Sequence, residues 1–289
     1  MMQSMHPALP SSLPPALPRL FAALLLGAAL LSACAAPPAT KSELQFQRPI
    51  VLLGEVHDNA AQHALRLAAF RDWLVGGARP ALLMEQFDRE RQPDIDRLLA
   101  QQPPPSADDL IAVGSPGPLD KSGWDWAFYR PFVALALQYR LPIVAANVSR
   151  NDAREVIRHG LAAQGFDAAV PIDISVSIAA TVLASHCGML QEPMAARMAL
   201  AQVARDQFMA RLVQAHAERG VLLLAGNGHV RTDVGVPRWL SPAVRARSEA
   251  IGLLETGSGE DAAAYDRAVF TPAHQRPDPC EAMRRGMPR

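Results

Sequence analysis

The chain has 289 residues, of which 49% are hydrophobic and 19% are charged, and its formal net charge is zero. A chain of this length and composition can bury a substantial core in one domain. The neutral charge balance excludes a protein that binds nucleic acid mainly by electrostatic attraction.

The N-terminal segment predicts an export signal. Arg19 precedes an apolar run at residues 20–31, which suits a signal-peptide core and is shorter than the ~20 residues that span a bilayer. The residues Leu31-Ser-Ala-Cys34 follow directly and resemble a bacterial lipobox, in which the cysteine is lipidated. We therefore expect a signal peptide with lipobox at residues 1–33, a lipidated N-terminus and tether at 34–48, and an α/β domain at 49–289. The alternative is an ordinary secreted protein with an incidental cysteine at position 34.

The residue after the predicted lipidation site indicates where the anchor lies. In enteric bacteria, an aspartate directly after the lipidated cysteine resembles an inner-membrane retention signal. This chain has Ala35 at that position instead. We therefore expect a lipid anchor in the outer membrane of the bacterial cell envelope, facing the periplasm. Membrane contact would be made through this anchor alone.

Two short apolar runs far apart in the chain end in similar polar residues. They are residues 50–57 (IVLLGEVH) and residues 221–229 (VLLLAGNGH). Each is too short for an independent helix and rich in branched aliphatic side chains, which predicts a strand buried on both faces of a parallel sheet. Because the carboxyl ends of such strands face the ligand crevice, Glu55, His57 and His229 are expected to converge.

Helices are expected between these strands. Asn59 can cap a helix that ends near Gly76, and its predicted apolar stripe consists of Ala60, Ala64, Leu67 and Leu74. Residues 124–132 are rich in aromatics and lead into a helix to about residue 139. A long helix from Pro193 to about His216 carries Asp206 on the same face as Met209.

Further apolar runs complete the sheet. Residues 81–87 and 142–147 predict buried strands whose exits carry Glu85 and Asn147. Late runs at 250–254 and 264–270 predict a mixed sheet with antiparallel edge strands. The expected fold class is α/β, a three-layer α/β/α sandwich with a mostly parallel central sheet.

Two cysteines remain after Cys34 is assigned to lipid. Cys187 and Cys280 could pair in an oxidising periplasm, but the sequence does not fix their separation. A free Cys187 acting as a soft ligand is the alternative.

Five motifs occur in an order that carries a family resemblance. They are Gly54-Glu-x-His57, Met84-Glu-Gln-Phe87, the segment 124–131, Ala201-Gln-x-x-x-Asp206-x-x-Met209-Ala210, and Gly226-Asn-Gly-His229-Val230. Together they resemble the ChaN family of iron-regulated haem-binding lipoproteins, from about residue 51 to 237. The paired strand ends resemble, more distantly, the Tiki and TraB proteins and the erythromycin esterases.

The resemblance implies a homodimer that holds two haems face to face. In the family, each iron is bound by a tyrosine, with a histidine of the partner subunit near the propionates. Tyr129 lies in the family-like aromatic segment and is the expected iron ligand, because a phenolate suits ferric haem. The alternative for Tyr129 is a core position with a bonded hydroxyl group. Arg130 and His186 are the expected propionate partners.

The polar residues at the strand ends and Asp206 allow a second interpretation. Glutamate and histidine supply oxygen and nitrogen donors that divalent zinc, manganese or cobalt accept, and Glu55 or Glu85 could then act as general base in amide or ester hydrolysis. A network that only orders the sheet edge is the alternative. The set consists of Glu55, His57, Glu85, Asn147, Asp206 and His229.

The expected function is therefore haem binding during iron acquisition, by a binding protein rather than an enzyme. A haem receptor of the outer membrane is the expected protein partner. The alternative function is that of a periplasmic metal-dependent hydrolase resembling Tiki and TraB proteins. A structural envelope lipoprotein is the third interpretation, and it explains none of the polar strand ends.

Overall fold

The computed structural model describes residues 42–278, 280–281 and 284. The predicted signal peptide, the lipobox and Cys34 lie outside these residues. Within the described part of the chain, no helix combines the length and the hydrophobicity needed to cross a bilayer.

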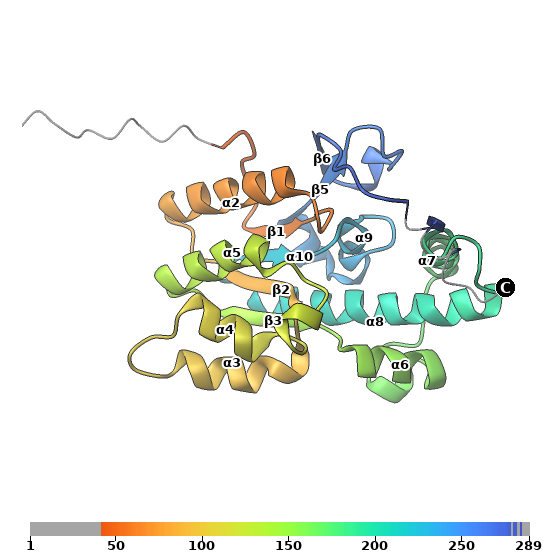
Figure 1. Ribbon diagram of the computed structural model, residues 1–289, viewed down its shortest axis with the longest axis horizontal. Coiled ribbons are helices and arrows are strands. Elements are labelled where there is room, and N and C mark those ends of the chain that lie inside the picture. Colours follow the sequence, from red (N-terminus) through yellow and green to blue (C-terminus); the bar gives the residue numbers. More distant parts are fainter. Residues whose placement is uncertain (1–41, 279, 282–283, 285–289) are drawn as a thin grey trace, which may run out of the picture. The chain divides into compact units, whose positions relative to one another are not determined.

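A six-stranded sheet organises the domain, with the strand order β3-β2-β4-β1-β5-β6 (Figure 1). All neighbouring strands are parallel, so the expectation of antiparallel edges is wrong. The connection between β5 and β6, residues 256–266, returns the chain toward the N-terminal end of β5. β6 can therefore run in the same direction as β5. The strands are β1 (Ile50–Leu53), β2 (Ala81–Asp88), β3 (Ile143–Asn147), β4 (Val221–Leu224), β5 (Ser248–Glu255) and β6 (Arg267–Thr271).

The register of the central strands aligns the predicted polar exits. Leu53 of β1 pairs with Leu224 of β4, which in turn pairs with Met84 of β2. The residues that follow these three therefore begin at the same level of the sheet. This alignment brings Glu55, Glu85 and the 226–229 segment to one edge.

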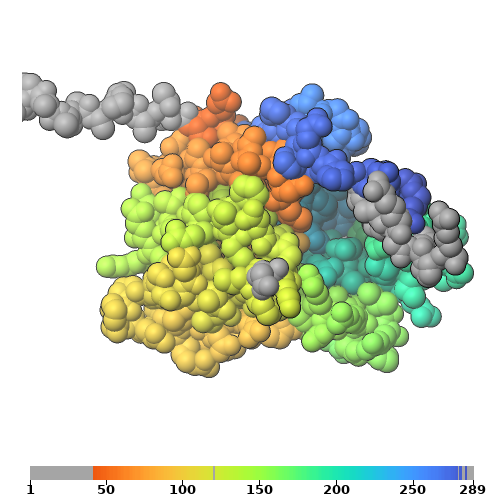
Figure 2. Space-filling model, viewed as in Figure 1, coloured from red at the N-terminus to blue at the C-terminus, as the bar shows by residue number. Residues whose placement is uncertain are grey.

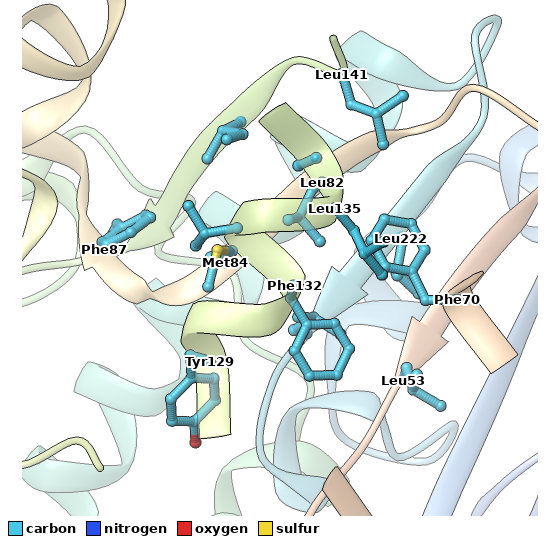
Figure 3. Packing of buried hydrophobic residues seen from close by; sticks show 14 of the residues in the cluster. Leu53, Phe70, Leu82, Met84, Phe87, Tyr129, Phe132, Leu135, Leu141 and Leu222 are labelled. Carbon is cyan, nitrogen blue, oxygen red and sulfur yellow. The ribbon is translucent and has the colours of Figure 1, made fainter. Parts of the chain in front are cut away.

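Helices cover both faces of the sheet, which confirms the predicted three-layer α/β/α sandwich. One face packs against α2 (Ala60–Val75), α3 (Gln92–Leu99), α4 (Ala107–Gly114) and α5 (Trp126–Gln138). Figure 3 shows this core, in which Phe70 and Phe132 meet strand residues such as Leu222. The other face packs against the C-terminal half of α8 (Glu192–His216), α9 (Asn227–Val230) and α10 (Pro242–Ala246).

A helical extension lies beyond the carboxyl end of the sheet. Helices α6 (Arg150–His159) and α7 (Ile172–Ser185) pack on the N-terminal half of α8 and form a separate apolar cluster that includes Ile178 and Val203 (Figure 1). This extension gives the strand ends a wall. Short 3-10 turns complete the fold at Arg89–Arg91, Leu119–Lys121, Ala162–Gln164, Val236–Trp239 and Ala262–Ala264.

Helix α2 begins where the sequence predicts, but of the predicted stripe only Leu74 is buried. The Asn59 side chain accepts a hydrogen bond from the Gln62 backbone at 3.1 Å, which confirms the cap. The predicted stripe residues Ala60 and Ala64 are exposed. The buried face instead carries polar side chains at its N-terminal end, because that end faces the polar strand exits; it consists of Gln62, His63, Arg66, Ala69, Phe70 and Leu74.

Residues that precede the first strand also pack against the core. Leu44 is buried in the core, and the backbone nitrogen of Ser42 donates to the Asp72 carboxylate at 2.5 Å. Phe46 contacts Trp73 edge to face, with ring centroids 5.2 Å apart. Residues 42–48 are therefore part of the fold, because their apolar side chains pack on α2.

Candidate functional site

A cavity of about 510 Å³, here called the main cavity, opens at the carboxyl ends of β1, β2 and β4. Figure 2 shows the hollowed surface between the loop before α5, helix α8 and the C-terminal segment. Apolar and aromatic side chains of α7, of the loop after α9 and of the segment before β6 form part of the wall, namely Ile178, Val182, Val234 and Tyr265. Its polar part is the predicted strand-end set, represented by Glu55, His57, Glu85, Asp206 and His229.

Glu55 is the buried centre of the β1 exit. One carboxylate oxygen, Oε1, accepts the Tyr129 hydroxyl at 2.5 Å, and Oε2 is ion-paired with the guanidinium of Arg66. Both partners are fully buried. Burial lowers the pKa of Arg66 to about 10, which leaves it charged at neutral pH. Glu55 is therefore held in place by a cation and a phenol, and it cannot reorient at small cost.

His57 is the exposed partner of that carboxylate. Its Nδ1 lies 2.7 Å from Glu55 Oε1, and its side chain is 49% exposed. Burial lowers the pKa of His57, despite the opposing charge of Glu85, so the imidazole favours its neutral form. No described residue bonds to Nε2, which leaves this nitrogen free for a ligand or a proton.

His229 lies between two carboxylates on the other side of the cavity floor. Its Nδ1 is 2.6 Å from Asp206, and its Nε2 is 3.5 Å from Glu85. Burial alone would lower the pKa of His229, but the charges of Asp206 and Glu85 raise it to about 10. Burial likewise opposes the charged form of Glu85, yet the neighbouring His229 lowers the Glu85 pKa to about 2. His229 is thus an imidazolium at neutral pH.

Glycines at the strand exits let these groups approach. A Cβ on Gly54 would lie 2.3 Å from the Asn227 side chain, which bonds to both backbone groups of Leu253. A Cβ on Gly226 would lie 3.1 Å from the His57 ring, and the Gly226 backbone nitrogen donates to Glu85 at 2.8 Å. The two glycine motifs therefore serve close packing of the strand exits.

A second cavity of about 340 Å³, here called the side cavity, adjoins the main one toward β3. Asn147, Arg150 and Arg205 contribute to its wall. Four residues contribute to the lining of both cavities, namely His57, Glu85, Gln202 and His229. The two spaces therefore meet at the histidine pair.

The structure brings the strand-end set together, as the sequence predicts. Asn147 lies apart from the other five, in the side cavity, where it donates to Asp88 at 3.2 Å and accepts from Arg205 at 3.2 Å. The structure also decides the cysteine pairing that the sequence left open, since Cys187 and Cys280 are joined by a disulfide. It ties the C-terminal segment to the end of α7.

The three residues predicted to contact haem are not in the main cavity. Tyr129 is fully buried, and Figure 3 shows its hydroxyl directed away from the apolar core. Burial raises its pKa, and the oxygen is bonded to Glu55, so this phenol is not available to an iron atom in this structure. Arg130 is exposed and ion-paired with Asp108. His186 contacts the Val182 carbonyl at 2.8 Å, beside the disulfide.

A metal site made from the strand-end set does not fit the geometry. Among the described residues, no three histidine, cysteine, aspartate or glutamate side chains are arranged to hold a metal ion. The reason is that their donor atoms are already paired within the protein, as Glu55 is with Arg66 and His229 is with Asp206. We derive no step through such a metal.

Four residues of this region escaped the sequence interpretation. Arg66 lies on a face of α2 that the sequence did not predict to be buried, and Tyr265 lies beside a late strand without a recognisable motif. Arg150 and Arg205 are single arginines on helices, where exposure is the ordinary expectation. For Arg66, the available signal was its spacing: it lies three residues after His63 and therefore on the same face of the helix.

Comparisons with known proteins bear on the fold and the family of this chain. A search of curated proteins found no match. The structure is similar to that of ChaN of Campylobacter jejuni, described by its cofacial haem binding, with a TM-score of 0.62 and 19% identity over 76% of this chain and 86% of that one. This likeness shows the fold.

Two weaker likenesses are to an erythromycin esterase EreC mutant in its open conformation and to the type III effector HopBA1. Their TM-scores are 0.44 and 0.42, each with 14% identity, over 73% and 78% of this chain and 71% and 88% of theirs. A family model matches residues 45–240, which is more than half of the chain. The protein therefore belongs to the family described as haem-binding uptake, Tiki superfamily, ChaN.

Proposed function

We propose that this protein binds haem in the main cavity during iron acquisition. The family supports haem as the ligand. The cavity combines an apolar wall, to which Ile178 and Val182 contribute, with a histidine whose outer nitrogen is free. A porphyrin requires both an apolar surface and an axial donor. The observation that carries the proposal is the half-exposed His57 facing this cavity.

His57 is the iron ligand that the geometry favours. Its Nδ1 is bonded to Glu55, which fixes the ring and leaves Nε2 for iron, as in metal sites where a carboxylate orients a histidine. Tyr265 also lines the cavity, but burial and the nearby Glu260 raise its pKa, which opposes the phenolate form. Tyr129 acts in this proposal as a support of Glu55.

A haemin titration tests the proposal. Wild-type protein should give a saturable Soret band, and His57→Ala should lose or shift that band at unchanged far-UV circular dichroism. Tyr265→Phe changes another residue that lines the cavity, serves as the matched control and should retain the wild-type spectrum. A wild-type titration without saturation contradicts haem binding. A spectrum that survives His57→Ala but is lost in Tyr265→Phe contradicts the choice of ligand.

The protein acts in this proposal as a lipid-anchored component of the bacterial envelope, facing the periplasm from the outer membrane. The apolar run at residues 20–31 and the lipobox ending at Cys34 support this location. A receptor of the outer membrane that supplies haem is the protein partner in this proposal. Cys34→Ala should move the protein from the membrane fraction to the soluble fraction. An unchanged distribution contradicts the anchor.

The proposed active form is a homodimer. The Campylobacter relative is described by cofacial haem binding, and a second copy would bring a second haem. Helix α7 supports this form, because Ile172 and Val176 are 77% and 60% exposed on its outer side while Ile178 and Val182 line the cavity on its inner side. A second copy would cover the exposed side.

Hydrolysis of an ester or amide is a second candidate function, favoured by the two histidine–carboxylate pairs at one cavity. The neutral His57 could take a proton from water at Nε2 while the water oxygen attacks a carbonyl carbon, and could then give that proton to the leaving group. The imidazolium of His229 would stabilise the developing negative charge. A panel of chromogenic esters and amides tests this function: turnover lost in both His57→Ala and His229→Gln supports it, and absence of turnover in wild type contradicts it.

A further inference from the structure

The side cavity holds two cationic side chains without an anionic partner. Neither Arg150 nor Arg205 has a carboxylate within ion-pair distance among the described residues, whereas Arg89 close by is paired with Asp152. Arg205 is half-buried and, within the described part of the chain, donates only to the Asn147 side chain, whereas Arg150 is exposed and donates to the Ser122 carbonyl at 3.4 Å. Both guanidinium groups therefore retain donors for an incoming anion.

The acidic groups of the side cavity are bonded to partners other than these two arginines. Glu85 is committed to His229 and to the Gly226 nitrogen. Asp88 is buried and accepts from Asn147, and burial raises its pKa despite the opposing charge of Arg205. Both carboxylates are therefore bonded to other partners and lie outside ion-pair distance of the two guanidinium groups.

The two arginines are accessible from the main cavity, because the main cavity and the side cavity share lining residues. Gln202 and the two histidines line both spaces. A ligand whose apolar body occupies the main cavity can therefore extend a polar arm past His57 toward Arg150 and Arg205. Arginine suits a carboxylate arm, since its planar fork binds two oxygens at once.

We propose that Arg150 and Arg205 form a carboxylate-binding subsite that recognises the propionate groups of a porphyrin held in the main cavity. This inference rests on the proposed haem binding and deepens it. It replaces Arg130, whose pairing with Asp108 on the exposed surface removes it from this role. The subsite gives the cavity its preference for a free dicarboxylate porphyrin over an esterified one.

The test compares haemin with haemin dimethyl ester, both titrated in the same detergent into the full-length protein. Wild type should bind haemin at least about tenfold more tightly, since one charged contact of this kind contributes roughly 1.5–3 kcal/mol. In Arg150→Met/Arg205→Met, affinity for haemin should fall to that for the ester, whereas affinity for the ester should not change. Arg150→Lys/Arg205→Lys should restore part of the preference, and Arg130→Met should retain all of it.

The outcomes separate the two proposals. If wild type binds neither porphyrin, haem binding itself is contradicted. If wild type binds both with equal affinity, or if the double methionine variant keeps its preference for haemin, the subsite is contradicted while haem binding stands. Circular dichroism and thermal unfolding of each variant ensure that a lost preference does not reflect a misfolded protein.

Discussion

Nδ1 of His57 lies 2.7 Å from a carboxylate oxygen of Glu55, so a half-exposed imidazole is held by a fully buried anion. The anion depends in turn on Arg66 and Tyr129, which approach it from α2 and α5. The orientation of the ligand-facing ring is therefore set by the core of the protein.

Removal of the buried cation should destabilise the fold strongly. Arg66→Met leaves the Glu55 carboxylate buried without its ion pair, and breaking such a pair costs about 3–5 kcal/mol. Tyr129→Phe removes one hydrogen bond and should cost about 1–2 kcal/mol. Denaturant unfolding measures both values.

Two further variants separate the charge effect from a general loss of packing. Arg66→Met/Glu55→Gln removes both charges and should recover much of the loss. Arg130→Met breaks an exposed pair and should leave unfolding unchanged. Equal losses in Arg66→Met and the double variant would argue against the ion pair as the cause.

The pH dependence of stability should carry the signature of His229. Its pKa rises from 6.5 to about 10 on folding, so the native state binds this proton more tightly than the unfolded state. The associated stability is fully present below pH 6.5 and is lost as the pH rises toward 10. Thermal unfolding across this range should show a decline that His229→Gln flattens.

Glu85 adds a dependence at the acid end. Its pKa is lowered to about 2, so its contribution is present above about pH 4.5 and is lost as the pH falls toward 2.

The control for the His229 variant is His159→Gln, which changes an exposed histidine on α6. A decline between pH 6.5 and 10 that is identical in wild type and His229→Gln would exclude His229 as its source.

The sequence predicts the central part of this fold well, because the strands are continuous apolar runs that end in polar residues. Periodicity could not fix the pairing direction of β6, since a short edge strand has the same composition in either direction. It also misassigned the buried face of α2. There the polar side chains of His63 and Arg66 are inside because they meet Glu55, a contact between elements that no local pattern records.

The sequence predicts that carboxylates and histidines meet at the strand ends, but it did not single out Arg66, Arg150, Arg205 or Tyr265. Glu55 and His229 follow buried strands, where topology alone brings them together. Tyr129 and Arg130 are neighbours in the same motif, yet one is fully buried and the other lies on the surface. Adjacent helical positions point about 100° apart, so a motif alone does not tell which of them faces the ligand.

Three alanine substitutions should distinguish the roles of the glycines. Gly54→Ala forces the Asn227 side chain from its two hydrogen bonds with β5 and should cost about 2 kcal/mol or more. Gly226→Ala presses on the His57 ring and should shift the haem spectrum more than it lowers stability. Gly228→Ala meets no atom within 4 Å and should leave both properties unchanged. Equal behaviour of Gly226→Ala and Gly228→Ala would contradict the close contact with His57.

A charge on the outer side of α7 should prevent dimer formation. Val176 is 60% exposed, and Val176→Asp would place a carboxylate in the proposed interface. Sedimentation with haemin should report a dimer for wild type and a monomer for this variant. Val75→Asp introduces the same charge at an exposed valine at the end of α2 and should remain dimeric. A monomer in every case would contradict the proposed assembly.

The disulfide should stabilise the wall of the main cavity. Cys187 follows the end of α7, and its bond to Cys280 closes a loop with a sequence separation of 93 residues. In the chain-entropy model, such a crosslink contributes about 4–5 kcal/mol as an upper value. Reduction should therefore lower the unfolding free energy and speed amide exchange along α7. It should also weaken haem binding, because Ile178 and Val182 on this helix line the cavity. The Cys187→Ser/Cys280→Ser variant should match the reduced protein and be insensitive to reductant, whereas equal α7 exchange in oxidised and reduced protein would show that the bond does not restrain the wall.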